Sequence, residues 1–317
     1  MRIVFCGTPQ FAVPTLKYLL AQPDFEIAGV ITQPDRPRGR GQEVSFSAVK
    51  VAALAAKLEV YQPEKIRAAE SEELLQKLTP ACVVIIAYGQ IIPARLLTIP
   101  KLGWINSHAS LLPKYRGAAP INWAIVNGEI RTGVTTMRID AGMDTGEMLL
   151  RREIEIGANE TAPELAARLS EIGGPLMAET LRGLAVGTIA SKMQNQAEAS
   201  YAPMLKKEDG RIDWKRPAAD IYNRMRGLAP WPGAYTTFRG QSCHVWGEPV
   251  SKEIGMSLPG GAAPGTLFDE KKELLVCCGD TTVLNVRLVQ VEGRKAVKAP
   301  DFANGARLKS GERFGDS

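Results

Sequence analysis

The sequence predicts an α/β domain with a parallel sheet, followed by a small OB-like β-barrel domain. From Ile3 to about Ala190, short apolar runs alternate with helical patterns, which is typical of parallel strands covered by helices. A polar stretch without sustained periodicity then runs to Lys207 and indicates a boundary. Short strands with Gly and Pro turns follow it, as in a small barrel. Since 317 residues exceed what one core usually serves, we expect domains at 1–190 and 207–317, joined by a linker at 191–206.

In the first domain the expected strands are the apolar runs IVFC, IAGVIT, CVVIIA and WINSHA. Helices are expected where capping residues precede an apolar period. Ser47 precedes AVKVAALAAKL, and Thr161 to Glu164 forms a capping box that opens a long helix. Gly187 is placed to end that helix.

In the second domain one helix is expected from Ala218 to Leu228, before the turn sequence PWPG. The expected strands are AYTTF, CHVW, GTLF, ELLVCC and TTVLNVRLVQV.

Composition excludes several classes of protein. The net charge of +5, from 39 basic and 34 acidic side chains, is too small for the whole surface to attract nucleic acid, so a local patch must bind any polyanion. Five cysteines without C-x-x-C spacing indicate neither a disulfide framework nor a zinc site. The chain enters RIVFCG without a cleavable leader, and its longest apolar run, ACVVIIA, is too short to span a bilayer. We therefore expect a cytoplasmic protein.

Ligands of open parallel sheets bind beyond the carboxyl ends of the strands. The first such end, Gly7-Thr8-Pro9, lacks G-x-G-x-x-G, which argues against a dinucleotide. Asn106 and His108 lie two residues apart on one expected strand, so an amide donor and a proton-exchanging imidazole share a face. The only other histidine, His244, lies in the CHVW strand without a polar companion, and we interpret it as structural.

Asp140 and Asp144 lie in a glycine-bearing loop between VTTMRI and MLLRREI. A metal site is one interpretation, although hard cations need more oxygen ligands than this loop offers. A hairpin turn stabilised by aspartate side chains is the alternative.

Taken together, these residues resemble the methionyl-tRNA formyltransferases, within the wider family that uses 10-formyltetrahydrofolate. The motifs that carry the resemblance, in chain order, are Gly7-Thr8-Pro9, Thr32 to Pro37 with Gly39-Arg40-Gly41, Ala87 to Pro93, Asn106-x-His108, Ser110 to Pro113, Tyr115 to Pro120, the Asp140 to Gly146 loop, and Arg211 to Trp214. The resemblance implies a Rossmann-like catalytic domain, a reduced folate as co-substrate and initiator methionyl-tRNA as acceptor. We expect no metal and no membrane, and no obligate protein partner is evident from the sequence.

The resemblance also implies roles for the three candidate catalytic residues. Formyl transfer to an amine passes through a tetrahedral intermediate with a negatively charged oxygen, which needs stabilisation and proton transfer. Asn106 would donate to the formyl oxygen, and His108 would supply the second electropositive contact. Asp144 would pair with His108 or order a water that relays the proton from the attacking amine to the leaving nitrogen.

Two further sets of residues follow from the resemblance. The residues expected to line the folate cleft are Ser110, Leu111, Leu112, Pro113, Tyr88, Gly89, Gln90, Ile91 and Ile92. The residues expected to meet tRNA are Arg36, Arg38, Arg40, Lys206, Lys207, Arg294, Lys295 and Lys298. A buried strand running into a proline-started helix is the alternative for AYGQIIP, and a solvated surface loop is the alternative for PDRPRGRGQ.

Three other functions remain open at this stage. A folate-dependent transferase acting on a small amine would need neither the arginine loop nor the barrel. A catalytically silent RNA-binding protein is a second alternative, against which the Asn106, His108 and Asp144 set argues. A nicotinamide oxidoreductase is suggested by fold analogy alone and disfavoured by the missing glycine fingerprint.

Overall fold

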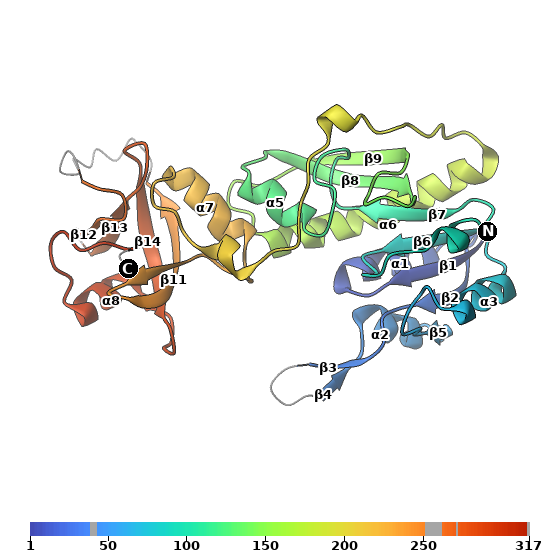
Figure 1. Ribbon diagram of the computed structural model, residues 1–317, viewed down its shortest axis with the longest axis horizontal. Helices are drawn as coiled ribbons and strands as arrows, with labels where there is room; N and C mark the ends of the chain where they lie inside the picture. Colours follow the sequence, from blue (N-terminus) through green and yellow to red (C-terminus); the bar gives the residue numbers. More distant parts are fainter. Residues whose placement is uncertain (39–42, 251–261, 271, 316–317) are drawn as a thin grey trace. The chain divides into compact units, whose positions relative to one another are not determined.

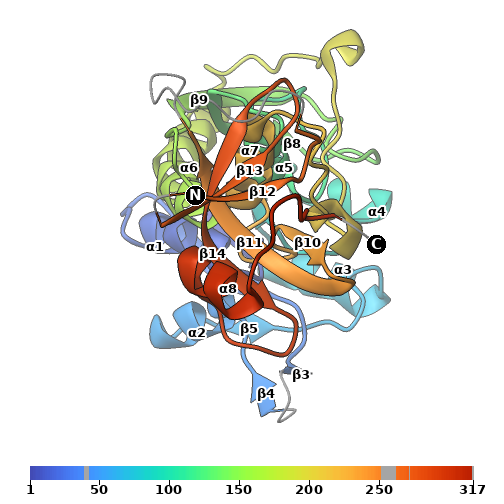
Figure 2. The ribbon, with the colours of Figure 1, turned by 90° about the vertical axis from the view of Figure 1, so that its left-hand side faces the viewer.

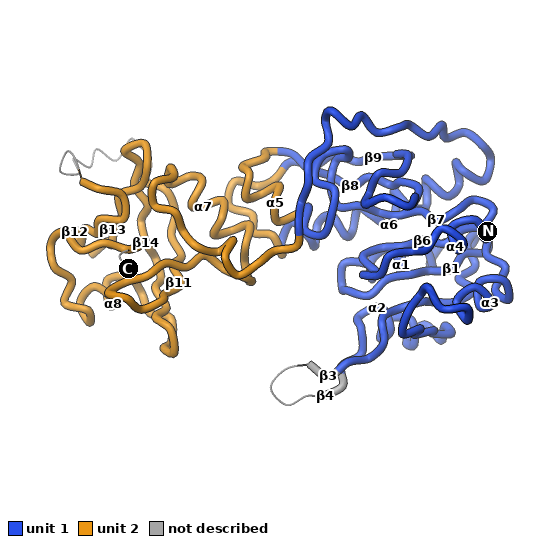
Figure 3. Tube along the Cα trace, viewed as in Figure 1, with its two compact units in different colours: residues 1–120, 131–155, 164–203 blue, residues 121–130, 156–163, 204–317 orange. Residues whose placement is uncertain are grey.

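The computed structural model describes residues 1–38, 43–250, 262–270 and 272–315. The chain divides into two compact units, which Figure 3 colours separately. Unit 1 comprises Met1–Pro120, Arg131–Glu155 and Glu164–Pro203, and unit 2 comprises Ile121–Ile130, Ile156–Pro163 and Met204–Ser317. Two short segments that lie between parts of unit 1 in the chain therefore belong to unit 2, and residues 191–203 belong to unit 1.

Unit 1 is built on a seven-stranded sheet with the order β5-β2-β1-β6-β7-β8-β9 (Figure 1). The strands are β1 (Arg2–Gly7), β2 (Glu26–Ile31), β5 (Val60–Tyr61), β6 (Cys82–Ile86), β7 (Trp104–His108), β8 (Arg131–Arg138) and β9 (Met148–Glu155). The four apolar runs expected as strands are confirmed as β1, β2, β6 and β7. In the sheet order, the strands from β5 to β7 pair in parallel, whereas β8 pairs antiparallel with β7 and β9 antiparallel with β8.

Helices cover both faces of this sheet. The helices of unit 1 are α1 (Val13–Leu20), α2 (Ala48–Ala55), α3 (Ala69–Leu78), α4 (Ala94–Leu97) and α6 (Ala162–Val186), whereas α5 (Pro120–Val126) belongs to unit 2 except for its first residue. Because successive side chains of β1 point to opposite faces of the sheet, they enter two different core clusters. Phe5 packs with residues of α1, α2 and α6, and Val4 packs with residues of α3 and α4. The result is a three-layer α/β unit, as the sequence predicts.

The predicted helix ends are confirmed at two places. The Ser47 hydroxyl accepts a hydrogen bond from the Lys50 amide, so it caps α2. Helix α6 ends at Val186, and Gly187 follows with φ of 71°, a left-handed conformation that glycine adopts without strain.

A small two-stranded ribbon, β3 (Arg36–Arg38) and β4 (Glu43–Ser45), projects from unit 1. At its base, Lys50 pairs with Asp35, and Gln62 donates to Asp35 at 2.9 Å. These two contacts lower the pKa of Asp35, with the Lys50 contact contributing most.

Unit 2 contains an antiparallel sheet with the order β10-β11-β14-β13-β12, and β15 pairs with β14. Its elements are α7 (Ala218–Gly227), β10 (Tyr235–Phe238), β11 (Gln241–Pro249), β12 (Leu267–Glu270), β13 (Glu273–Cys277), β14 (Val283–Val291), β15 (Val297–Lys298) and α8 (Ala299–Ala306). The predicted small β domain is confirmed as an antiparallel sheet, and the predicted helix from Ala218 to Leu228 is confirmed as α7. Helix α8, which the sequence analysis did not predict, packs beside β14 (Figure 2).

The core of unit 2 includes four aromatic side chains. Trp214 stacks on Phe314 with ring centroids 5.6 Å apart, and Phe238 meets Phe302 edge to face at 5.1 Å. These contacts attach α8 to the sheet. His244 lies on β11 beside Tyr235 and Trp246, in agreement with a structural role.

The described part of the chain contains no helix long and apolar enough to cross a membrane. It also contains no group of three or more His, Cys, Asp or Glu side chains suited to a metal ion. All five cysteines are buried free thiols.

Candidate active site

Strand β7 carries Asn106 and His108 to the carboxyl end of the parallel sheet. Asn106 is half-buried and lies between Ile85 of β6 and Met137 of β8, whereas His108 is buried and faces Thr135. The two side chains therefore leave the same face of one central strand.

The histidine ring has a defined tautomer. Its Nε2 lies 2.9 Å from the backbone oxygen of Tyr115. A carbonyl oxygen can only accept, so Nε2 carries a hydrogen, and Nδ1 is the nitrogen that exchanges protons. Nδ1 lies 3.6 Å from Oδ2 of Asp144, a distance too long for a direct hydrogen bond but within ion-pair range once the ring is protonated.

Asp144 is held independently of the histidine. The Gly117 amide donates to Oδ2 of Asp144 at 2.8 Å, and the aspartate itself has φ of 52°. Gly117 has φ of 116°, and a Cβ there would lie 2.8 Å from the Ala202 carbonyl oxygen, so this close approach requires glycine.

Asp140 has a different environment. Its carboxylate accepts from the Gly142 amide at 3.0 Å and from the Thr145 hydroxyl at 2.8 Å. These contacts support the turn-stabilising interpretation of Asp140 and leave Asp144 as the carboxylate that faces His108.

The segment from Ser110 to Pro113 forms a tight turn after β7. The Thr135 hydroxyl donates to the Ser110 carbonyl at 2.7 Å, and the Leu112 amide donates back to that hydroxyl at 3.2 Å. The Ser110 hydroxyl itself donates to Lys114 O at 2.6 Å. These hydrogen bonds are made within the turn and to Thr135 of β8. Ser110, Leu112 and Pro113 are buried, and Leu111 is partly exposed.

The second expected cleft segment, Tyr88 to Ile92, follows β6. The Tyr88 carbonyl accepts from the Thr8 hydroxyl at 3.1 Å and from the Gln33 amide at 3.0 Å, which ties three strand ends together. Gly89 has φ of 88°, Gln90 accepts from the Ile66 amide, and Ile92 is buried. Ile91 is 89% exposed, the kind of apolar side chain that a ligand can cover.

Tyr88 is also buried, and burial raises the pKa of its hydroxyl. Within the described residues that hydroxyl has no hydrogen-bond partner.

The basic residues expected to meet tRNA lie in separate places. Arg36 and Arg38 belong to β3, and Arg40 lies outside the described residues. Lys206 and Lys207 begin a short 3-10 helix of unit 2.

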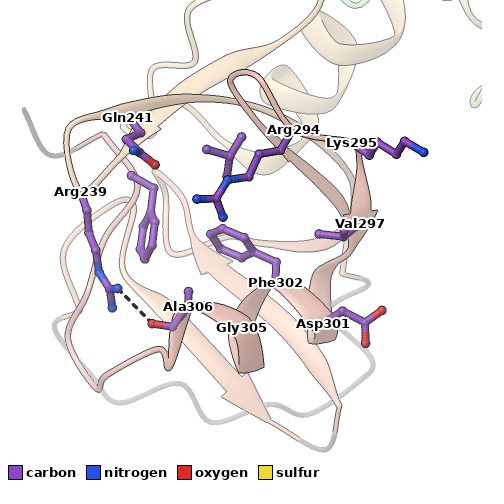
Figure 4. A pocket seen from close by; sticks show the side chains of 11 residues that line it. Arg239, Gln241, Arg294, Lys295, Val297, Asp301, Phe302, Gly305 and Ala306 are labelled. Carbon is purple, nitrogen blue, oxygen red and sulfur yellow. Dashed lines mark hydrogen bonds between the residues drawn. The ribbon is translucent and has the colours of Figure 1, made fainter.

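Arg294 and Lys295 line a cavity of about 530 Å³ in unit 2 (Figure 4). The Arg294 guanidinium points into this cavity toward Phe302, whereas Lys295 points outward. Lys298 is the residue that precedes α8, next to the cavity residue Val297.

Arg116 and Gln194 join the site although the sequence analysis assigned them no role. Arg116 is fully buried, and Gln194 bonds to the backbone of the Asp144 loop. Gln194 lies in the polar stretch expected to be a linker, so nothing in its neighbourhood pointed to the site. For Arg116, the one signal in the sequence that could have indicated a role was its position inside the Tyr115 to Pro120 motif.

Comparison with known proteins assigns the family. Residues 1–181 match the formyl transferase family, and residues 204–307 match the formyl transferase C-terminal domain. A methionyl-tRNA formyltransferase of Solibacter usitatus is 55% identical over 316 residues, covering 100% of this chain and 99% of the relative. The chain belongs to the methionyl-tRNA formyltransferase family. A second methionyl-tRNA formyltransferase, from Koribacter versatilis, is 49% identical and covers 99% of each chain.

Solved structures agree on the fold. An N-formyltransferase from Helicobacter canadensis, in complex with folinic acid and dTDP-3-aminofucose, matches with a TM-score of 0.64 and 19% identity, covering 90% of this chain and 98% of that one. A sugar 3N-formyl transferase matches with a TM-score of 0.63 and 19% identity over 93% of this chain and 99% of that one. At this identity the likeness concerns the fold that a methionyl-tRNA formyltransferase shares with sugar formyltransferases.

Proposed function

We propose that this protein transfers the formyl group of 10-formyltetrahydrofolate to the α-amino group of methionyl-initiator tRNA in the cytoplasm. The observation that carries the proposal is the arrangement of Asn106, His108 and Asp144, with Nδ1 of His108 3.6 Å from a carboxylate that a backbone amide holds in place. Full-length similarity to methionyl-tRNA formyltransferases supports the choice of acceptor.

The reaction begins when the neutral amine of methionine attacks the formyl carbon. A C–N bond forms, and the carbonyl π electrons move to the oxygen of a tetrahedral intermediate. The side-chain amide of Asn106 donates to that oxygen and stabilises its negative charge.

Collapse of the intermediate requires a proton to leave the attacking nitrogen and another to reach N10. Nδ1 of His108 accepts the first, directly or through a water held by Asp144, and the ring becomes an imidazolium. Asp144 stabilises this cation, since both its position and that of the ring are fixed by backbone contacts. The proton then passes to N10, the C–N10 bond breaks, and tetrahydrofolate leaves.

We further propose that the folate lies against Tyr88 to Ile92 and Ser110 to Pro113, where exposed Ile91 would contact an apolar part of the ligand. Two similar structures hold folates, folinic acid in one and 5-N-formyl-THF in the other, which supports a formyl-folate co-substrate. Under this proposal unit 1, which includes residues 191–203 of the expected linker, carries catalysis, and residues 207–317 bind tRNA together with the arginine loop. Arg294 is one candidate for this contact, because its residue is exposed and its guanidinium points into the cavity of unit 2.

The deciding experiment is a formylation assay with charged initiator tRNA and 10-formyltetrahydrofolate. We expect formylmethionyl-tRNA, with no product from uncharged tRNA. A dTDP-amino sugar serves as the competing acceptor, since similar folds act on such amines. Formylation of the sugar but not of the charged tRNA would refute the acceptor while leaving formyl transfer intact, and no formylation of either would refute the enzymatic function.

A further inference from the structure

We propose that Arg116 and Gln194 are positioning residues that hold Asp144 against His108, so that the stretch expected to be a linker forms part of the catalytic site. The inference rests on the proposed function of Asp144. It concerns residues for which the motifs of the sequence indicated no role.

The first step is the environment of Arg116. Its side chain is fully buried, and its guanidinium donates three hydrogen bonds to neutral amide oxygens. Nε and Nη2 both bind Oε1 of Gln194, at 2.9 and 2.7 Å, and Nη1 binds Oε1 of Gln196 at 2.8 Å. Burying a cation is costly, so an arginine kept among amide oxygens indicates a task that a smaller apolar residue would not perform.

The second step concerns the orientation of the Gln194 amide. Because its oxygen accepts both arginine bonds, its nitrogen must point the other way. There Nε2 donates to the carbonyl oxygens of Asp144 and Gly146, each at 2.8 Å. A flipped amide would direct oxygen at two carbonyl oxygens, so Arg116 selects the orientation that holds the loop.

The third step is the backbone of the same segment. The Arg116 amide donates to Ser200 O at 2.8 Å, and the Ala202 amide donates to Arg116 O at 2.7 Å. The Ser200 hydroxyl also accepts from the Tyr115 amide at 2.9 Å. Ser200 and Ala202 therefore anchor the backbone of the turn from Tyr115 to Gly117.

These contacts hold both partners of the catalytic pair. On one side, Tyr115 O binds Nε2 of His108 and the Gly117 amide binds Oδ2 of Asp144. On the other side, Gln194 binds the backbone of the Asp144 loop. Arg116 links the two groups of contacts, because it stands between Tyr115 and Gly117 in the chain and its guanidinium binds Gln194. Its loss would therefore release the aspartate from both directions. Misplacement of a reacting group by about 1 Å can cost roughly 10²-fold in rate.

The test is Gln194→Glu, which keeps the size and the bond to Arg116 but removes the two donors to the loop. We expect kcat to fall by roughly 10²-fold, while KM for 10-formyltetrahydrofolate and for methionyl-tRNA changes by less than about 3-fold. The pH–rate profile should change shape as well, because the distance between His108 and Asp144 is altered. A purely structural role would lower the folded fraction and leave that shape unchanged.

The matched control is Gln196→Ala. It removes another hydrogen bond of Arg116, but Gln196 has no bond to the Asp144 loop among the described contacts. Turnover of this variant should stay within about 3-fold of wild type, the scale of one modest hydrogen bond. An equal loss of kcat in both variants would overturn the proposal, since the effect would then come from the packing of Arg116.

Gln194→Met is the second variant, in case the new carboxylate prevents folding. It keeps the side-chain length without polar atoms and should show the same loss of kcat. Wild-type kcat and pH profile in a folded Gln194 variant would overturn the positioning role. Failure of the proposed function gives a different result, because wild-type protein would then not formylate methionyl-tRNA at all.

Discussion

Replacing Asp144 with asparagine separates the charge of this side chain from its shape. Asparagine keeps an oxygen that can accept from the Gly117 amide, so the loop should retain its geometry. What disappears is the negative charge 3.6 Å from Nδ1 of His108. The variant therefore measures how much the carboxylate stabilises the imidazolium that forms during proton transfer.

The size of the effect follows from the distance and the burial. Two unit charges 3.6 Å apart attract by about 1 kcal/mol in bulk water and by about 4–5 kcal/mol at an effective dielectric constant of about 20. The side chains of His108 and Asp144 are 6% and 17% exposed, so an intermediate value of about 3 kcal/mol applies. At 1.36 kcal/mol for each factor of ten, Asp144→Asn should lower the rate of formyl transfer by roughly 10²-fold.

The assay is single-turnover formylation with both substrates saturating, so that the chemical step is measured and not product release. Asp140→Asn is the control, because it removes a carboxylate from the same loop whose contacts are confined to Gly142 and Thr145 among the described residues. That variant should stay within about 3-fold of wild type, since surface turn contacts contribute little. The reasoning is wrong if Asp144→Asn reacts at the wild-type rate, or if the control loses as much.

Three further predictions concern other parts of the molecule. His108→Ala should lower turnover by roughly 10²-fold or more with tRNA affinity nearly unchanged, because it removes the proton carrier; a folded variant with normal turnover would exclude the residue from the mechanism. Arg294→Ala should reduce the slope of log affinity for tRNA against log salt concentration by about 0.7–0.9, measured by filter binding between roughly 50 and 200 mM salt. An unchanged slope and affinity would show that Arg294 does not contact tRNA. Burial raises the pKa of Cys82 and of Cys278 to about 12, so little thiolate exists near neutral pH and iodoacetamide should modify these thiols only after unfolding. Rapid alkylation of these two thiols in the native protein near neutral pH would contradict that burial.

The sequence predicts well the features that depend on local periodicity and on the residues that begin and end helices. The four apolar runs of unit 1 became strands, Ser47 caps α2, and Gly187 ends α6. The two-residue spacing of Asn106 and His108 sufficed to predict a shared face, since side chains alternate along any strand. The roles assigned to these residues stay predictions until the variants are measured.

What the sequence could not predict depends on contacts between distant segments. Gln194 meets the Asp144 loop across 50 residues, and a polar stretch without periodicity gives no indication of its partners. Helix α8 has only eight residues, and its Phe302 is buried in the core of unit 2. So short a helix is stabilised by tertiary contacts and not by its own sequence. Arg40 lies outside the described residues.

The carbonyl of Tyr115 has a consequence for how substrates must enter. Because this carbonyl binds Nε2 of His108, Nδ1 is the one ring nitrogen that can accept and release a proton. A histidine with two open nitrogens could collect a proton on one side and release it on the other, whereas this one must return it through the atom that received it. The incoming amine and the departing N10 must therefore both approach the same edge of the ring. The tetrahedral intermediate meets that condition, because both nitrogens are bonded to the same carbon.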